Sequence, residues 1–170
     1  MSLTGRDALT GKLESIRTYK GTLITRDDLA LLEGRAFRAY REFTATTTIK
    51  LVFTKPFRLT SQTLWTGQGA ARAVVITGGT EGGTFGAMPT LFNKNTQLNT
   101  ASTTTATVGG TVTGGTEREV LRSDSGTAGG GVGSPNLQDG DRMLAASTYY
   151  IIITVTGTTS GMYSLEWVES

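Results

Sequence analysis

The clearest pattern in the chain is the alternation of apolar and polar side chains between residues 37 and 54. The apolar side chains on one side of this stretch are Phe37, Ala39, Phe43, Ala45, Ile49, Leu51 and Phe53. Successive side chains of a strand point to opposite faces, so the pattern predicts one long strand, or two joined by a bend, with one buried face. The many threonines and the lack of an apolar stripe at helical spacing argue against a helix.

Similar short alternations predict further strands along the chain. They span residues 57–65, 70–77, 103–108, 111–113 and 117–123, with a short edge strand within 87–95. In the first of these strands, Phe57, Leu59 and Trp65 are expected on one face. The glycine-rich run 78–86 predicts a loop or a pair of turns, and residues 124–140 predict a long loop.

The end of the chain predicts two more strands, joined as a hairpin. Residues 148–156 are apolar on both faces, which suits a central strand. Residues 162–168 alternate, and the glycine-containing segment 157–161 between the two predicts a turn. About seven to eight short strands without intervening helices indicate an all-β protein. We expect a β-sandwich of the jelly-roll type, with a small closed barrel as the alternative.

Charged residues are concentrated at the start of the chain. The first 42 residues contain eight Lys or Arg and six Asp or Glu, whereas the remaining 128 contain eight of each. The start is also too short and too rich in glycine to fold alone, so its apolar side chains need a partner surface. We therefore expect two units, an extended N-terminal arm at residues 1–36 and a β-sandwich domain at residues 37–170.

The arm is expected to contain one or two short helices. Leu9, Leu13 and Ile16 lie at helical spacing, although glycines interrupt this segment. Residues 25–34 predict a helix more clearly, because a Thr three residues before an Asp resembles a capping box and Gly34 suits the helix end.

The amino-acid composition narrows the possible chemistry. The chain contains no cysteine and no histidine, so disulfides, thiolate metal sites and the commonest general base are excluded. The net charge of +2 is too small to indicate nucleic acid as a partner. No apolar run reaches the roughly 20 residues of a membrane span, and none follows the N-terminus as in a signal peptide. We therefore expect a soluble protein that is made in the cytoplasm and has no membrane partner.

Two local patterns could bind a ligand, but each departs from the required spacing. Residues 5–12 resemble a phosphate-binding loop, yet five residues separate the glycines instead of four, and Leu13 stands where a hydroxyl should bind Mg²⁺. Asp124, Asp139 and Asp141 lie in or beside a glycine-rich loop, but their spacing fits no EF-hand. The glycine clusters also lack the G-x-G-x-x-G spacing of a dinucleotide site. We expect no cofactor and no metal.

The sequence contains no recognisable catalytic set of residues. Without His or Cys, a hydrolase would need paired carboxylates or a Ser-Lys pair, and no G-x-S-x-G nucleophile elbow is present. Five aromatic side chains could stack on sugars or bases, but at strand spacing they share faces with Ile and Leu, so we expect them in the core. They are Trp65, Tyr149, Tyr150, Tyr163 and Trp167. The sequence therefore predicts a binding or structural protein, not an enzyme.

The order of several segments is similar to that of a known group of proteins. Residues 92–95 (FNKN) follow a glycine-rich turn, and a glycine-rich loop at 126–133 precedes residues 148–152 (TYYII) and 164–169 (SLEWVE). In this order, residues 37–170 resemble the capsid decoration or cement proteins of tailed bacteriophages, small virion proteins with a jelly-roll body. The resemblance implies many copies on the capsid surface, which bind neighbouring major capsid subunits and associate as dimers or trimers. It implies no particular functional residues.

The N-terminal arm is the candidate contact site in this interpretation. Its basic side chains would meet acidic groups of a neighbouring subunit or of the capsid, and its apolar side chains would pack beside them. The candidate contact residues are Arg6, Leu9, Lys12, Leu13, Arg17, Lys20, Arg26, Leu29 and Leu32. Alternatively, the arm could wrap around its own sandwich. Two other classes also stay open: a tail-fibre or receptor-binding module that contacts a host glycan, and a lectin or carbohydrate-active enzyme on the same fold.

Overall fold

The structure, a computed structural model, describes most of the chain. The described residues are 3–6, 13–16, 18–19, 22–23, 26–88, 91–98, 100–124 and 142–169. Near the N-terminus the elements are β1 (Leu3–Arg6), β2 (Leu13–Ile16), β3 (Thr18–Tyr19), β4 (Thr22–Leu23) and α1 (Arg26–Leu32). The body contains β5 (Ala36–Phe43), β6 (Thr47–Phe53), β7 (Phe57–Thr77), β8 (Thr80–Ala87), β9 (Leu91–Asn93), β10 (Thr105–Thr113), β11 (Thr116–Asp124), β12 (Arg142–Leu144) and β13 (Ser147–Glu169).

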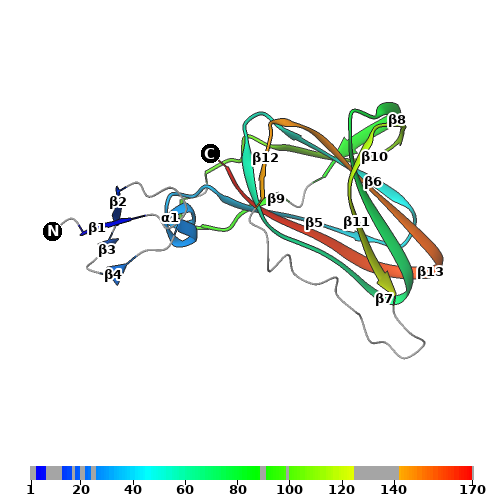
Figure 1. Cartoon of the computed structure of the whole chain (residues 1–170). Helices are drawn as coiled ribbons and strands as arrows, with labels where there is room; N and C mark the ends of the chain where they lie inside the picture. Colours follow the sequence, from blue (N-terminus) through cyan, green and yellow to red (C-terminus); the bar gives the residue numbers. More distant parts are fainter. Residues whose placement is uncertain are drawn as a thin grey trace.

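Two long strands, β7 and β13, run through both sheets of a β-sandwich. The first sheet has the order β11-β7-β13-β6-β10-β8 and uses the second half of β7 and the first half of β13. The second sheet joins β12, the other halves of β7 and β13, β5 and β9. All these pairs are antiparallel, and Figure 1 shows β7 and β13 extending along the whole body. The predicted all-β sandwich is confirmed.

The long strands pass from one sheet to the other at a bend. Between two paired positions, Gly69 of β7 lies opposite three residues of β13, 157–159. Gly69 and Gly157 have φ angles of +75° and +71°, which strain any residue with a side chain. When one of two paired strands has extra residues between two paired positions, the strands bend sharply. The predicted hairpin is therefore wrong, because residues 148–156 and 162–168 belong to one strand and its glycines form a bulge instead of a turn.

The core lies between the two sheets, on the face that the alternation predicts. The stretch from residue 37 to residue 53 divides into β5 and β6, one of the two predicted arrangements. The apolar side chains of its predicted inner face are buried, except Ala45, which is exposed in the bend between the two strands. In this stretch, alternation therefore defined the inner face wherever the backbone stays extended.

Aromatic rings occupy the centre of this core. The rings of Phe53 and Phe57 stack with centroids 3.5 Å apart. Tyr149 and Trp167 present their edges to Phe53 at 5.8 Å and 5.5 Å, a favourable arrangement for aromatic quadrupoles. Of the five aromatic side chains expected in the core, all but Trp65 are buried.

Trp65 is 42% exposed because of a register shift within β7. Leu59 pairs with Trp167 and Ser61 with Glu166, so residue 60 is an extra residue in β7. An extra residue turns every following side chain to the opposite face. Trp65 therefore points away from the core, although Leu59 points into it.

Strand β8 corrects another prediction. The run 78–86 was expected to form a loop or turns, but β8 pairs with β10 over most of this segment. β10 is itself one strand, where two short ones were predicted, and β12 was not predicted. At Gly82 the pairing favours glycine, because a Cβ atom there would lie only 2.8 Å from the hydroxyl of Thr111. Of the long loop expected at 124–140, Asp124 ends β11 and the other residues lie outside the described part.

The structure confirms one helix in the arm, α1, within the predicted segment 25–34. The second helical prediction is wrong, because Leu13–Ile16 forms β2, which pairs with β1. A helix that short is marginal in water, whereas paired strands satisfy each other's backbone groups. The predicted boundary between arm and body at residue 36 stays a prediction. No helix in the described ranges has the length and apolar character needed to cross a membrane.

Candidate functional site

Helix α1 lies against one end of the sandwich, where β13 finishes (Figure 1). The helix ends at Gly34, whose φ of +68° suits a residue without a side chain. The Gly34 amide donates to the Leu31 carbonyl at 3.0 Å, and the Arg35 amide donates to the Ala30 carbonyl at 2.9 Å. These two hydrogen bonds together form a Schellman motif. Ala30 is buried, so the helix packs on the body through its small residue.

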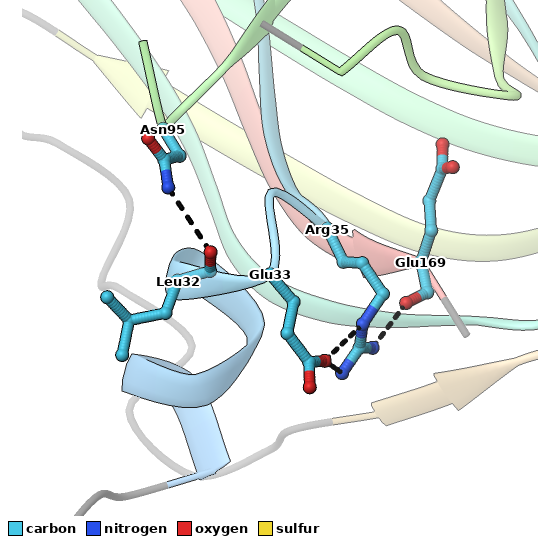
Figure 2. A network of polar contacts seen from close by, with 5 residues as sticks. All are labelled: Leu32, Glu33, Arg35, Asn95 and Glu169. Carbon is cyan, nitrogen blue, oxygen red and sulfur yellow. Dashed lines mark hydrogen bonds and ion pairs between the residues drawn. The ribbon is translucent and has the colours of Figure 1, made fainter. Parts of the chain in front are cut away.

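Asparagine side chains join the helix end to the segment that contains and follows β9. Asn95 donates through Nδ2 to the carbonyl of Leu31 at 3.0 Å and to that of Leu32 at 3.4 Å. Figure 2 shows Asn95 pointing at the last turn of the helix. Asn93 donates to the Gly34 carbonyl at 2.8 Å. The last carbonyls of a helix have no partner within the helix, so these bonds fix its position on the body.

Arg35 connects the same helix end to the last residues of β13. Its Nη1 donates to the Glu169 carbonyl at 2.8 Å, and the Glu169 amide donates back to the Arg35 carbonyl at 2.9 Å. Its Nε also donates to a carboxylate oxygen of Glu33 at 2.8 Å, as Figure 2 shows. The segment that joins the arm to the body is therefore bonded to the end of β13.

The carboxylate of Glu169, a residue only 7% exposed, is bound by neutral donors of a nearby loop. The Thr103 amide and hydroxyl donate to one oxygen at 3.1 Å and 2.9 Å. The Thr104 hydroxyl donates to the other at 2.9 Å, together with the Ser102 hydroxyl. Burial by itself raises the pKa of this carboxyl, but the hydrogen bonds outweigh it and hold the pKa below its usual value.

A charged triad lies on the outer side of the second sheet. Glu166 of β13 accepts from Arg38 Nε at 2.7 Å and from Lys94 Nζ at 2.6 Å. Burial by itself raises the pKa of Glu166. The hydrogen bonds and charges of Lys94 and Arg38 lower the pKa by more than that, so the net shift is downward. These partly exposed pairs contribute more to the register of β5, β13 and the segment after β9 than to stability.

Four exposed apolar side chains lie on α1 or on the segment that is bonded to its end, and we call them the arm-end surface. They are Leu31, Leu32, Phe92 and Leu98, each between 37% and 51% exposed. Phe92 stacks on Tyr40 with ring centroids 5.7 Å apart. Among the described residues, the other large apolar side chains with such exposure are Trp65 and Met143. A group of exposed apolar side chains on a rigid support is typical of a contact surface.

The structure tests only part of the predicted contact set. Leu32 is exposed on the arm-end surface and Leu29 is partly buried. Arg6 and Leu13 face each other in the pairing of β1 and β2, and Arg26 begins α1, but the side chains of these three lie outside the described part. The residues that lie wholly outside the described ranges are Leu9, Lys12, Arg17 and Lys20. Their contact role stays a prediction.

Sequence reasoning missed Phe92, Leu98 and Glu169. Leu98 is an isolated apolar residue within a polar segment rich in Asn and Thr, and that isolation was the available signal; Phe92 follows Leu91 at the start of this segment. The role of Glu169 had no local signal, because its donors are more than sixty residues away.

Other predicted ligand positions gain no support as a site. Asp124 is exposed at the end of β11, whereas Asp139 and Asp141 lie outside the described residues. In the part of the chain that the structure describes, no group of three or more acidic, His or Cys side chains is placed to hold a metal ion.

Comparison of the chain with protein-family models, with curated proteins and with solved structures returns no match. Function is therefore inferred from the chain's own residues and geometry.

Proposed function

We propose that this chain is a virion structural protein of a tailed bacteriophage, a capsid decoration or cement protein without enzymatic activity. In this proposal it is made in the host cytoplasm and binds the outside of the phage head. There it stabilises contacts between major capsid subunits. Its partners are the major capsid protein and further copies of the chain, as dimers or trimers, and include neither nucleic acid nor a membrane.

The observation that supports this proposal most is the arm-end surface. Leu31, Leu32, Phe92 and Leu98 are exposed beside the point where the arm meets the body. Hydrogen bonds hold their supporting segments in place, so binding would cost little ordering of the backbone. The highly charged arm precedes this surface in the chain, and such charges steer association and add salt dependence. A docking surface and a charged arm together suit a protein that binds neighbouring subunits.

Binding to purified phage heads that lack the protein tests the proposal. We expect the full chain to co-sediment with the heads, and a chain that begins at Arg26 to bind at least about tenfold more weakly. The shortened chain keeps α1 and its contacts with the body, so it should retain the cooperative unfolding of the sandwich. Leu32→Asp and Phe92→Asp should each weaken binding, because a charge would have to be desolvated in the interface.

Thr154→Asp is the matched control, since it places the same charge on an exposed position of the first sheet, in β13. It should leave binding unchanged. Full-strength binding by the shortened chain and by both surface variants would disprove the role of this end. Failure of the full chain to bind any head would contradict the cement proposal itself.

A second candidate function follows from the exposed indole of Trp65. Aromatic side chains on a sheet surface can stack on sugar rings, so a receptor-binding module that contacts a host glycan is the alternative. A glycan array with the full chain and with Trp65→Ala separates the two. Binding to a defined glycan that the variant loses would favour the receptor-binding module over the cement protein.

A further inference from the structure

A cavity of about 470 Å³ lies between the two sheets. Its lining comes from both layers, including β6 and both halves of β7 and β13. β11 and β12 stand at its side, and in the described pairings each of them pairs only with β7. The described edges of the two sheets therefore do not pair with each other, and among the described residues the cavity is open on that side.

The cavity wall is mainly apolar and aromatic. Its largest apolar side chains include Leu51, Phe53, Phe57, Leu59 and Tyr149. An apolar cavity of about 150 Å³ is already large enough to bind benzene, and its apolar lining keeps water out. Ligand pockets have volumes of roughly 300 to 1,000 Å³. The space between these sheets is therefore large enough for a molecule with one or two rings.

Two neutral polar groups line the cavity without a partner. The Tyr163 hydroxyl and the Gln62 Nε2 are buried, each in a residue only 2% exposed. Gln62 lies close enough to the Tyr163 hydroxyl to affect its pKa, but neither atom makes a hydrogen bond of good geometry among the described residues. Buried polar groups almost always have a partner. Burial raises the pKa of the Tyr163 phenol far above its usual value, the charge of Glu119 adds to this, and the neighbouring Gln62 side chain lowers the pKa by less, so the hydroxyl keeps its proton as a donor. Both groups can therefore donate to one acceptor inside the cavity.

The charged residues that line the cavity are Arg118, Glu119 and Arg142, and two of them form an ion pair. Arg142 of β12 donates through Nη2 to Glu119 of β11 at 2.6 Å, which links the two sheet edges, while its Nε is buried without a hydrogen bond among the described residues. Arg118 donates through Nε to the Thr77 hydroxyl at 3.0 Å. The donors inside the cavity, Gln62 and Tyr163, are neutral, and Arg118 is an exposed residue. A charged ligand buried beside these donors would lose its hydration without a buried counter-ion, so the cavity favours an uncharged molecule.

We propose that this cavity binds a small, uncharged, mostly apolar ring compound with one oxygen acceptor, an alcohol, a phenol or a ketone. Its ring packs between the aromatic side chains, and its oxygen accepts hydrogen bonds from Gln62 Nε2 and the Tyr163 hydroxyl. This site is independent of the arm-end surface and of the proposed function.

Two probes that differ only in the oxygen test the proposal on the full chain, namely 1-naphthol and naphthalene. Calorimetry and thermal unfolding measure their binding. We expect 1-naphthol to bind about tenfold more tightly than naphthalene and to raise the unfolding temperature, because only naphthol satisfies the buried donors. Tyr163→Phe keeps the ring and removes the hydroxyl, so it should abolish most of this preference and leave naphthalene binding unchanged. Tyr40→Phe, which removes a hydroxyl outside the cavity, is the matched control.

Ala146→Trp keeps the test decisive if Tyr163→Phe does not fold. Ala146 is an exposed residue at the cavity, so the larger side chain should obstruct entry without disturbing the core, and both probes should lose affinity. The proposal is overturned if wild-type chain binds neither probe, or binds both equally. A crystal soaked with 1-naphthol that shows only ordered water between Tyr163 and Gln62 would overturn it too.

Discussion

Replacing Glu169 by Gln should destabilise the sandwich at neutral pH and much less in acid. The substitution keeps the size and one acceptor oxygen of the side chain but removes the charge. At the other oxygen, the new amide would face the Thr103 amide and hydroxyl, which are themselves donors at 3.1 Å and 2.9 Å. Two bonds to a charged acceptor are lost, each worth about 1.5 kcal/mol or more, so we expect a loss of about 2–4 kcal/mol in the free energy of unfolding.

The pH dependence follows from the direction of the pKa shift. The pKa of Glu169 is lower in the folded protein than in the unfolded chain, because hydrogen bonds from the Ser102–Thr104 loop outweigh burial. The ionised carboxylate therefore stabilises the fold above the unfolded pKa, and this contribution is lost as the pH falls through the folded pKa. The difference between wild type and Glu169→Gln should shrink accordingly between neutral pH and acid.

Urea unfolding at neutral pH and in acid measures both effects, with midpoint and slope fitted together. Glu117→Gln is the matched control, because Glu117 is an exposed carboxylate that pairs with Arg72 at 3.5 Å on the surface. It should change the free energy of unfolding by less than about 1 kcal/mol. If Glu169→Gln costs no more than this control, or costs the same at both pH values, the carboxylate does not hold the loop as described.

Three further predictions concern the core, the bend and an outer polar contact. Trp167→Ala should reduce the free energy of unfolding by about 3–5 kcal/mol in urea, since the indole is fully buried against Phe37 and Phe53; an unchanged midpoint would contradict the core position. Gly157→Ala should cost about 1–2 kcal/mol, because its φ of +71° strains a side chain, whereas Thr154→Ala in the same strand should cost much less in the same assay. Burial and a hydrogen bond to Glu81 raise the pKa of the Tyr150 phenol to about 12. Its stabilising contribution is therefore complete below the ordinary tyrosine pKa and is lost as the pH rises from there through the folded pKa of about 12. The absorbance titration of wild type minus Tyr150→Phe should therefore have a late midpoint, and an ordinary one would contradict the contact.

The sequence by itself determined the faces of the strands and the position of the helix. Phe37, Ile49 and Trp167 are buried where alternation predicted them, because side chains of an extended chain alternate whatever strand lies beside it. The end of α1 at Gly34 followed from an equally local cause, since a residue without a side chain tolerates the left-handed backbone of a helix cap. The helical segment that carries Leu32 of the arm-end surface was predictable for the same reason.

Only the tertiary structure decided how the strands are joined and which side chains meet. Glycines at residues 157 and 161 suit a turn or a bulge equally well, and the strand β7 alongside made this segment a bulge in a continuous β13. A single extra residue in β7 turned Trp65 outward, and its position depends on pairing with a distant strand. Glu169 and its donors are likewise distant in the chain. Pairing register and long-range hydrogen bonds depend on residues far apart in the chain, so local periodicity carries no record of them.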